Sequence, residues 1–315
     1  MSIHHITAIA GDPQRNLDFY TGTLGLRLVK VTVNFDDPGT YHFYLGDELG
    51  RPGSILTFFP WPRGRPGRHG TGQVGAVSLA IPPASLGFWL ERLLSQGVKH
   101  EGPTRRFGEQ VLELRDPDGL LLELVASRRV SGVGPWEGGP VPAEHAVRGL
   151  YGATIWEDGD KGTAGLLQGT MGFRPVGEEG NRLRFDSASE GVGTVVDLRR
   201  TQGFWSGSGG VGTVHHVAFR TQSDQEQLAR REELEGLGLG VTPVLDRQYF
   251  RSIYFREPGG VLFEIATEAP GFAVDESPAE LGTRLQLPPM YQASREQIEQ
   301  SLPPLRLPLA AAREG

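Results

Sequence analysis

The chain repeats one order of predicted elements four times over its 315 residues. Each unit of about 70 residues starts with a strand, continues with a helix and ends in further strands, giving a βαβββ order. Internal repetition of this length indicates an architecture built from similar modules. The first strands of the four units are predicted at Ile3–Asp12, Val74–Ile81, Leu150–Trp156 and Thr213–Arg220.

Glycines mark the ends of the predicted helices, because glycine readily takes the left-handed conformation that follows a helix. Helices are predicted at Pro13–Leu24, Ser85–Gln96, Thr163–Met171 and Ser223–Leu237, and the first three are followed by Gly25, Gly97 and Gly172. Units one and two are expected to form a domain over residues 1–128, and units three and four a second over 147–268. A Gly- and Pro-rich linker is predicted over 129–146.

The last segment, 269–315, is rich in proline and carries one predicted helix near Ser294–Gln300. Its apolar residues indicate that it packs across the body of the protein rather than forming a disordered tail. They are Phe272, Leu285, Leu287, Met290 and Tyr291.

Composition narrows the chemistry and the partners. The chain has no cysteine, which excludes disulfides, thiolate nucleophiles, iron–sulfur clusters and cysteine-bound zinc. The net charge of −7 argues against a nucleic-acid partner. We find no apolar run of 18 residues and no signal peptide, so neither a membrane span nor export is expected, and a cytoplasmic location fits.

A predicted hairpin places one acid in an apolar strand. Arg251–Arg256 and Val261–Thr267 flank a turn at Glu257–Gly260, and a hairpin centred near Gly259 sets Tyr254 opposite Glu264. A carboxylate between Phe263 and Ile265 is costly to bury without a partner. Cross-strand neighbours on one face lie about 5 Å apart, so the Tyr254 hydroxyl can reach the surroundings of this acid.

Equivalent positions of the four units supply a set of metal ligands. The first strands align His5 with His216, and place Ala76 and Tyr151 at the same position in units two and three. The last strands align Thr57, Glu123, Asp197 and Glu264. Units one and four therefore offer two histidines and one carboxylate, the donor set of non-haem Fe(II) oxygenases. For these side chains to meet, units one and four should share one curved sheet.

Strand alternation selects one histidine from each pair. His5 shares a face with Thr7, and His216 shares one with Ala218, whereas Ile6 and Val217 face the helices. His42 either lines the same pocket or is exposed. Glu123 and Asp197 are interpreted as structural, and the aromatic residues Trp61, Trp89, Phe204 and Trp205 are expected in the core.

Several of these segments resemble a known family. IHHIT, GTVHHVAF, IYFREPGGVLFEIATE and NFDDPGTYHFYLGDELGRPGSILTFFPW are similar to the vicinal oxygen chelate superfamily, also called the glyoxalase/bleomycin resistance/dioxygenase fold. Within it they resemble the ring-cleaving dioxygenases that act on hydroquinones, and the resemblance extends over nearly the whole chain. It implies an α+β fold in which four βαβββ modules form two curved mixed-sheet half-barrel pairs, with modules one and four bearing the metal site.

The resemblance also implies roles for individual residues. His5, His216 and Glu264 match the metal ligands, and the implied metal is Fe(II), with Mn(II) as the alternative. Five further residues match positions that line the family's active site: His4, Thr7, His215, Arg247 and Tyr254. His4 and His215 depart from strict strand alternation, so a local twist or bulge is required there.

The sequence therefore favours an Fe(II)-dependent, extradiol-type dioxygenase that opens a hydroquinone or catechol ring with O₂. His215 or Tyr254 is expected to transfer a proton, and Arg247 to hold a hydroxyl, a substituent or developing charge on the ring. His4, Thr7 and Arg247 are expected to bind the substrate. A homo-oligomer is compatible with the sequence. Two alternatives remain: a glyoxalase-I-like lyase or isomerase, which Thr57 disfavours, and a metal-free binding or resistance protein.

Overall fold

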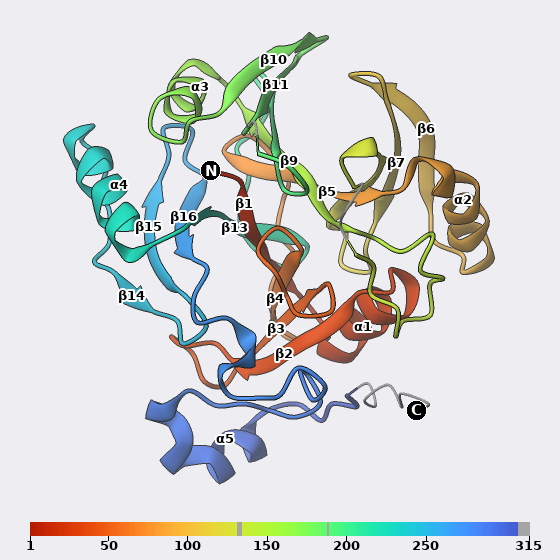
Figure 1. Cartoon of the computed structure of the whole chain (residues 1–315), viewed down its shortest axis with the longest axis vertical. Coiled ribbons are helices and arrows are strands. Elements are labelled where there is room, and N and C mark those ends of the chain that lie inside the picture. The colour runs from red at the N-terminus through yellow and green to blue at the C-terminus, as the bar shows by residue number, and fades with distance from the viewer. Residues whose placement is uncertain (131–133, 188, 308–315) are drawn as a thin grey trace.

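The strands form two curved, mixed sheets (Figure 1). The structure is a computed structural model that describes residues 1–130, 134–187 and 189–307. The first sheet has the order β14-β15-β16-β13-β1-β4-β3-β2, and the second has the order β10-β11-β12-β9-β5-β8-β7-β6. The two sheets with their few helices give the α+β fold that the family resemblance implies.

Strands of units one and four make up the first sheet. They are β1 (Ile3–Ala10), β2 (Arg27–Val33), β3 (Tyr41–Gly46), β4 (Ile55–Pro60), β13 (Thr213–Thr221), β14 (Leu245–Asp246), β15 (Arg251–Arg256) and β16 (Leu262–Thr267). The antiparallel pair β1–β13 joins the two units at the centre of the sheet. The pairing of units one and four, inferred from where the ligands lie, is confirmed.

Strands of units two and three make up the second sheet. They are β5 (Gln73–Ile81), β6 (His100–Arg106), β7 (Glu109–Arg115), β8 (Leu121–Ala126), β9 (Gly149–Glu157), β10 (Arg174–Glu179), β11 (Arg182–Asp186) and β12 (Val195–Arg200). Each half of the chain therefore contributes one unit to each sheet. Of the predicted linker, residues 131–133 lie outside the described residues.

Helices follow the first strand of each unit, as predicted. They are α1 (Pro13–Leu17) with a π-helical continuation (Asp18–Thr23), α2 (Leu86–Ser95), α3 (Lys161–Gln168) and α4 (Asp224–Gly236). Gly25, Gly97 and Gly172 have φ angles of 70°, 67° and 68°, a conformation that strongly favours glycine. Ile6 and Val217 are fully buried on the face away from the ligands. In the described residues, no helix is long and apolar enough to span a membrane.

The second sheet carries ion pairs where the first carries the candidate ligands. Glu123 pairs with Arg106, and Asp197 pairs with Arg182 and Arg184. These ion pairs agree with the interpretation of Glu123 and Asp197 as structural.

The strand register also corrects one alignment. In the strand register, Asp197 lies opposite Thr154 just as Glu264 lies opposite Ala218. Two residues before each of these partners are Gly152 and His216, so Gly152 rather than Tyr151 corresponds to His216.

The C-terminal segment packs on the body of the protein, beside β2 (Figure 1). Phe272 and Leu287 are buried, and the predicted helix is present as α5 (Arg295–Ser301). Met290, expected to pack, is instead 61% exposed. Residues 308–315 of this segment lie outside the described part of the chain. Trp89 is in the core as expected, whereas the expectation is wrong for Phe204 and Trp205, which are exposed.

Candidate metal centre and its cavity

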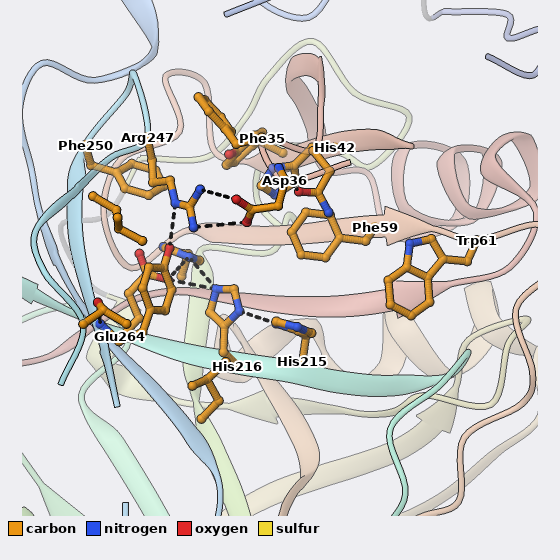
Figure 2. A pocket seen from close by; sticks show the side chains of 17 residues that line it. Phe35, Asp36, His42, Phe59, Trp61, His215, His216, Arg247, Phe250 and Glu264 are labelled. Atoms are coloured by element: carbon orange, nitrogen blue, oxygen red, sulfur yellow. Dashed lines mark hydrogen bonds and ion pairs between the residues drawn. The ribbon is translucent and has the colours of Figure 1, made fainter. Parts of the chain in front are cut away.

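Three buried side chains converge from adjacent strands of the first sheet. His5 lies on β1, His216 on β13 and Glu264 on β16. The His5 and His216 Nε2 atoms are 3.3 Å apart. Glu264 Oε2 lies 2.9 Å from His216 Nε2 and 3.3 Å from His5 Nε2. Figure 2 shows Glu264 and His216 beside the cavity. The structure therefore brings together the three predicted ligands.

The spacing of these atoms fits a single divalent cation. Ligand atoms at about 2.1 Å from one ion and at right angles to each other would be roughly 3.0 Å apart. Glu264 is fully buried, and its Oε2 lacks a hydrogen bond of acceptable geometry within the described residues, despite its contact with His216. A buried carboxylate oxygen in this position needs a positive partner. A metal ion held by these three side chains would supply it.

The protonation states suit metal binding, which requires neutral imidazoles and an ionised carboxylate. Burial raises the pKa of Glu264, but His5 and His216 outweigh it and hold that pKa well below its usual range. Burial lowers the pKa of His216. Glu264 and His216 are therefore in the protonation states that bind a cation at neutral pH.

The second histidine of each pair supports the ligand histidine. The Nδ1 atoms of His4 and His5 are 2.9 Å apart, and those of His215 and His216 are 2.8 Å apart. Burial lowers the pKa of His4 to about 3, so its neutral ring can accept a hydrogen bond from His5. We assign the ligand tautomer from this network: Nδ1–H donates, which leaves Nε2 free for a metal.

A strand irregularity allows neighbouring histidines to contact each other. The β1–β13 register shifts between Ile3 and His5 and again between Thr7 and Ala8. This confirms the bulge or twist that the two histidine pairs require.

A threonine occupies the position that corresponds to Glu264 in unit one. In the parallel pair β1–β4, Thr57 lies opposite Thr7, just as Glu264 lies opposite Ala218 in the parallel pair β13–β16. The Thr57 hydroxyl lies 2.8 Å from Thr7 Oγ1 and 3.0 Å from His42 Nε2. Thr7 Oγ1 is also 2.9 Å from His216 Nε2. The position therefore holds a neutral hydrogen-bonded chain instead of a second carboxylate.

The β15–β16 hairpin supplies the groups around Glu264. Tyr254 pairs with Glu264, which confirms the predicted register. Arg247 Nε donates to the Tyr254 hydroxyl at 3.3 Å. Burial and the charge of Glu264 raise the pKa of Tyr254, so its hydroxyl stays protonated at neutral pH. Ser252, two residues before Tyr254, is fully buried. Its hydroxyl donates a hydrogen bond to Glu264 Oε1, which leaves Oε2 directed at the histidines.

A cavity of about 400 Å³ opens beside these ligands. Its polar lining is His5, His42, His215, His216, Asn34, Asp36, Thr242, Arg247, Tyr254 and Glu264. Its apolar and aromatic lining is Phe35, Tyr44, Phe59, Trp61, Leu245, Phe250 and Leu262. A volume of this size suits a small ring compound, and the aromatic walls suit its faces.

Three of the five further residues predicted to line the active site do line this cavity, and two do not. His215, Arg247 and Tyr254 line it, whereas His4 and Thr7, predicted to bind substrate, lie against the ligand histidines instead. His42 takes the pocket position that the sequence left open. Trp61, expected in the core, lines the cavity.

Some residues of the site were missed by sequence reasoning. Ser252, which donates to Glu264, could have been found, because it shares a strand face with Tyr254. Phe35 and Asp36 lie in the loop between β2 and β3, where no periodic pattern shows which side chains turn inward. Phe250 lies at the start of the hairpin and packs against the His5 ring with centroids 5.1 Å apart.

Comparison with known proteins shows which family this chain resembles. The family model of the Glyoxalase/Bleomycin resistance protein/Dioxygenase superfamily matches residues 2–124 and 159–265. A protein named "Putative ring-cleaving dioxygenase MhqO", from Bacillus subtilis (strain 168), is 50% identical over 98% of this chain and 97% of its own length. The Chlorohydroquinone/hydroquinone 1,2-dioxygenase of Sphingobium indicum is 35% identical, with 94% of each chain covered.

Solved structures show the same architecture. A crystal structure from Bacillus subtilis subsp. subtilis str. 168, described as a "putative dioxygenase", matches with a TM-score of 0.93 at 49% identity, covering 97% of each chain. Glyoxalase I from Zea mays matches with a TM-score of 0.63 at 18% identity, covering 85% of this chain and 92% of that one. This second similarity shows a shared fold alone.

Proposed function

This chain belongs to the Glyoxalase/Bleomycin resistance protein/Dioxygenase superfamily, and we propose that it is an Fe(II)-dependent, extradiol-type ring-cleaving dioxygenase acting on a hydroquinone or a catechol. The observation that carries this proposal is the convergence of His5, His216 and Glu264 beside an aromatic cavity, with Thr57 in place of a second carboxylate. The names of the relatives MhqO and chlorohydroquinone/hydroquinone 1,2-dioxygenase support the same reaction class.

His5, His216 and Glu264 would hold the metal on one side of the cavity. When bound there, Fe(II) supplies Lewis acidity toward a ring hydroxyl and the redox chemistry needed for O₂. Three protein ligands would leave coordination positions for substrate and O₂, which a fourth ligand, a carboxylate at position 57, would reduce.

The side chains of the cavity would position the ring and manage its protons. Phe35, Phe59 and Phe250 offer apolar surfaces for the ring faces. His215 reaches the cavity wall, and its pKa is lowered first by desolvation of its ring and then by His216. It is therefore neutral at pH 7, and because its Nδ1 accepts from His216, its Nε2–H can donate a hydrogen bond to a ring oxygen. Tyr254 remains a hydrogen-bond donor, and Arg247 can stabilise negative charge on the ring.

The isomerase alternative lacks the second carboxylate that would serve as its base. Moving a proton between adjacent carbons requires a base close to the metal, and the hydroxyl of Thr57 does not ionise near neutral pH. The structural similarity to glyoxalase I concerns the fold and does not supply that base.

Oxygen consumption tests the proposal directly. The protein is purified anaerobically, loaded with Fe(II) or Mn(II), and given a hydroquinone, a catechol or the hemithioacetal of methylglyoxal and glutathione. A dioxygenase adds both atoms of one O₂ to the ring, so we expect one O₂ consumed per ring-opened product. Turnover of the hemithioacetal without O₂ uptake would overturn the proposal.

A further inference from the structure

We infer that Asp36 determines which ring substituents the cavity accepts, because its ion pair with Arg247 favours dihydroxylated rings with uncharged substituents over carboxylated ones. This inference rests on the proposed function and concerns the choice among its ring substrates.

Asp36 and Arg247 come from opposite ends of the chain and meet at the cavity. Asp36 belongs to the loop between β2 and β3, and Arg247 to the loop between β14 and β15. Arg247 Nη1 lies 3.4 Å from Asp36 Oδ1, and Nη2 lies 3.3 Å from Asp36 Oδ2. Figure 2 shows the two contacts side by side. The carboxylate therefore faces both terminal nitrogens of the guanidinium.

The loop that carries Asp36 is held in place from two directions. The Asn34 amide donates to the Thr40 carbonyl at 2.8 Å and closes the loop at its base. The Tyr291 hydroxyl, from the C-terminal segment, donates to the Phe35 carbonyl at 2.8 Å. Asp36 N also donates to Asn34 Oδ1 at 2.9 Å. The backbone on either side of Asp36 is thus fixed opposite Arg247.

Arg247 is the sole Lys or Arg side chain among the described residues that line the cavity. Its nitrogens face Asp36 and the Tyr254 hydroxyl, and its guanidinium carbon lies 5.8 Å from the Phe35 ring centre and 5.4 Å from that of Tyr254. Asp36 therefore already pairs with the side chain that an anionic substituent would use.

A carboxylated ring meets an unfavourable arrangement here. It has to compete with Asp36 for Arg247, and a displaced Asp36 stays tethered nearby as a like charge. A methyl, halogen or amide substituent meets no such competition, and apolar walls such as Phe59 and Leu262 accept it. The Asp36 side chain is 77% exposed, so water screens the effect and we expect discrimination of roughly tenfold rather than several thousandfold.

The experiment compares two rings of the same shape that differ in charge, 2,5-dihydroxybenzoate and 2,5-dihydroxybenzamide. For Fe(II)-loaded wild-type protein and Asp36→Asn, kcat/KM is measured by O₂ uptake for each ring. Binding is measured anaerobically by calorimetry. We expect the preference of wild-type protein for the amide over the acid to fall about tenfold in Asp36→Asn. Asp224→Asn is the control, because it removes the same charge from an exposed pair with Arg251 outside the cavity.

The outcomes separate this inference from the proposed function. The role of Asp36 would be overturned if wild-type protein and Asp36→Asn prefer the amide over the acid equally. It would also be overturned if Asp224→Asn lowers that preference as much as Asp36→Asn does. If no ring supports O₂ uptake, the proposed function fails, and the calorimetric preference still decides whether Asp36 selects against the acid. A lower preference for the amide in Asp36→Asn alone supports the inference in either case.

Discussion

At the scale of single residues, the candidate centre depends on how each oxygen of Glu264 is used. Ser252 donates to Oε1, while Oε2 lies near His5 and His216. Without the Ser252 hydroxyl, the buried carboxylate could rotate and Oε2 would lose its fixed direction. Groups that orient metal ligands in this way commonly change metal affinity by about 10–100-fold.

Ser252→Ala is therefore expected to lower Fe(II) affinity by about 10–100-fold, with the fold retained. The measurement is a competition titration against a chelator, with circular dichroism to check folding. Ser277→Ala is the matched control, because Ser277 donates to Glu280 on the surface of the C-terminal segment. Equal affinity in wild-type protein and Ser252→Ala would show that Ser252 does not orient the ligand.

Tyr254 belongs to the same scale, because its hydroxyl interacts with Arg247 and lies next to the ligand strand. Tyr254→Phe keeps the ring and removes only the hydroxyl. Metal content should stay unchanged while kcat falls by about 10²–10⁴, the usual contribution of a group that donates or accepts a proton. Steady-state O₂ consumption at saturating substrate measures kcat. An unchanged kcat would exclude a catalytic role for the hydroxyl.

At the scale of elements, the C-terminal segment holds the loop that carries Arg247. Asp275 Oδ2 accepts hydrogen bonds from Gln248 Nε2 at 2.8 Å and from the Tyr249 hydroxyl at 2.9 Å. Its Oδ1 lies 2.6 Å from Nζ of Lys30, which is fully buried. Gln248 has a φ angle of 65°, which is unfavourable for a residue with a side chain. The segment thus stabilises a strained loop from behind the cavity.

Asp275→Asn is expected to lower the free energy of unfolding by about 1.5–3 kcal/mol, since it removes charge-assisted hydrogen bonds. Because the loop positions Arg247, KM for the ring should rise as well. Urea unfolding and steady-state kinetics measure the two effects, and Glu280→Gln on the surface of the same segment is the control. A change in stability without any change in KM would separate the segment from the cavity.

At the scale of the whole molecule, two buried acids meet between the sheets. Glu157 ends β9 in the second sheet, and Glu257 follows β15 in the first. Thr163 Oγ1 lies 3.2 Å from Glu157 Oε1 and also contacts Glu257. Burial first, and then the charge of Glu257, raise the pKa of Glu157 to about 8. The folded protein therefore holds a proton on Glu157 at pH 7 that the unfolded chain releases.

This proton makes stability depend on pH. The folded-state pKa of Glu157 lies above its ordinary value of 4.5. The contribution of the protonated Glu157 to the free energy of unfolding is therefore lost as pH rises from about 4.5 through about 8. Glu157→Gln removes that contribution, so the stability of wild-type protein relative to the variant should fall across this range. Urea midpoints measured at several pH values test the expectation. Parallel pH profiles for the two proteins would contradict it.

Much of the site was predictable because its signals are either local or repeated along the sequence. The glycine turn and the strand pattern of Arg251–Thr267 set the hairpin register, and so placed Tyr254 opposite Glu264. The repeat aligned His5 with His216 and Thr57 with Glu264. This alignment led to the prediction that units one and four share one sheet. Turn chemistry acts between residues near one another in the chain, and equivalent positions of a repeat can be compared before the fold is known, so the sequence alone determined these features.

Other features exist only after distant segments meet. Asp36 reaches Arg247, and Asp275 reaches Lys30, because closing the first sheet and packing the C-terminal segment bring remote loops together. The strand bulges decided that His4 supports a ligand instead of lining the cavity, since one extra residue changes the direction of every later side chain. Loops have no repeating pattern that fixes where their side chains point, so the tertiary structure alone decided the cavity's charge and shape.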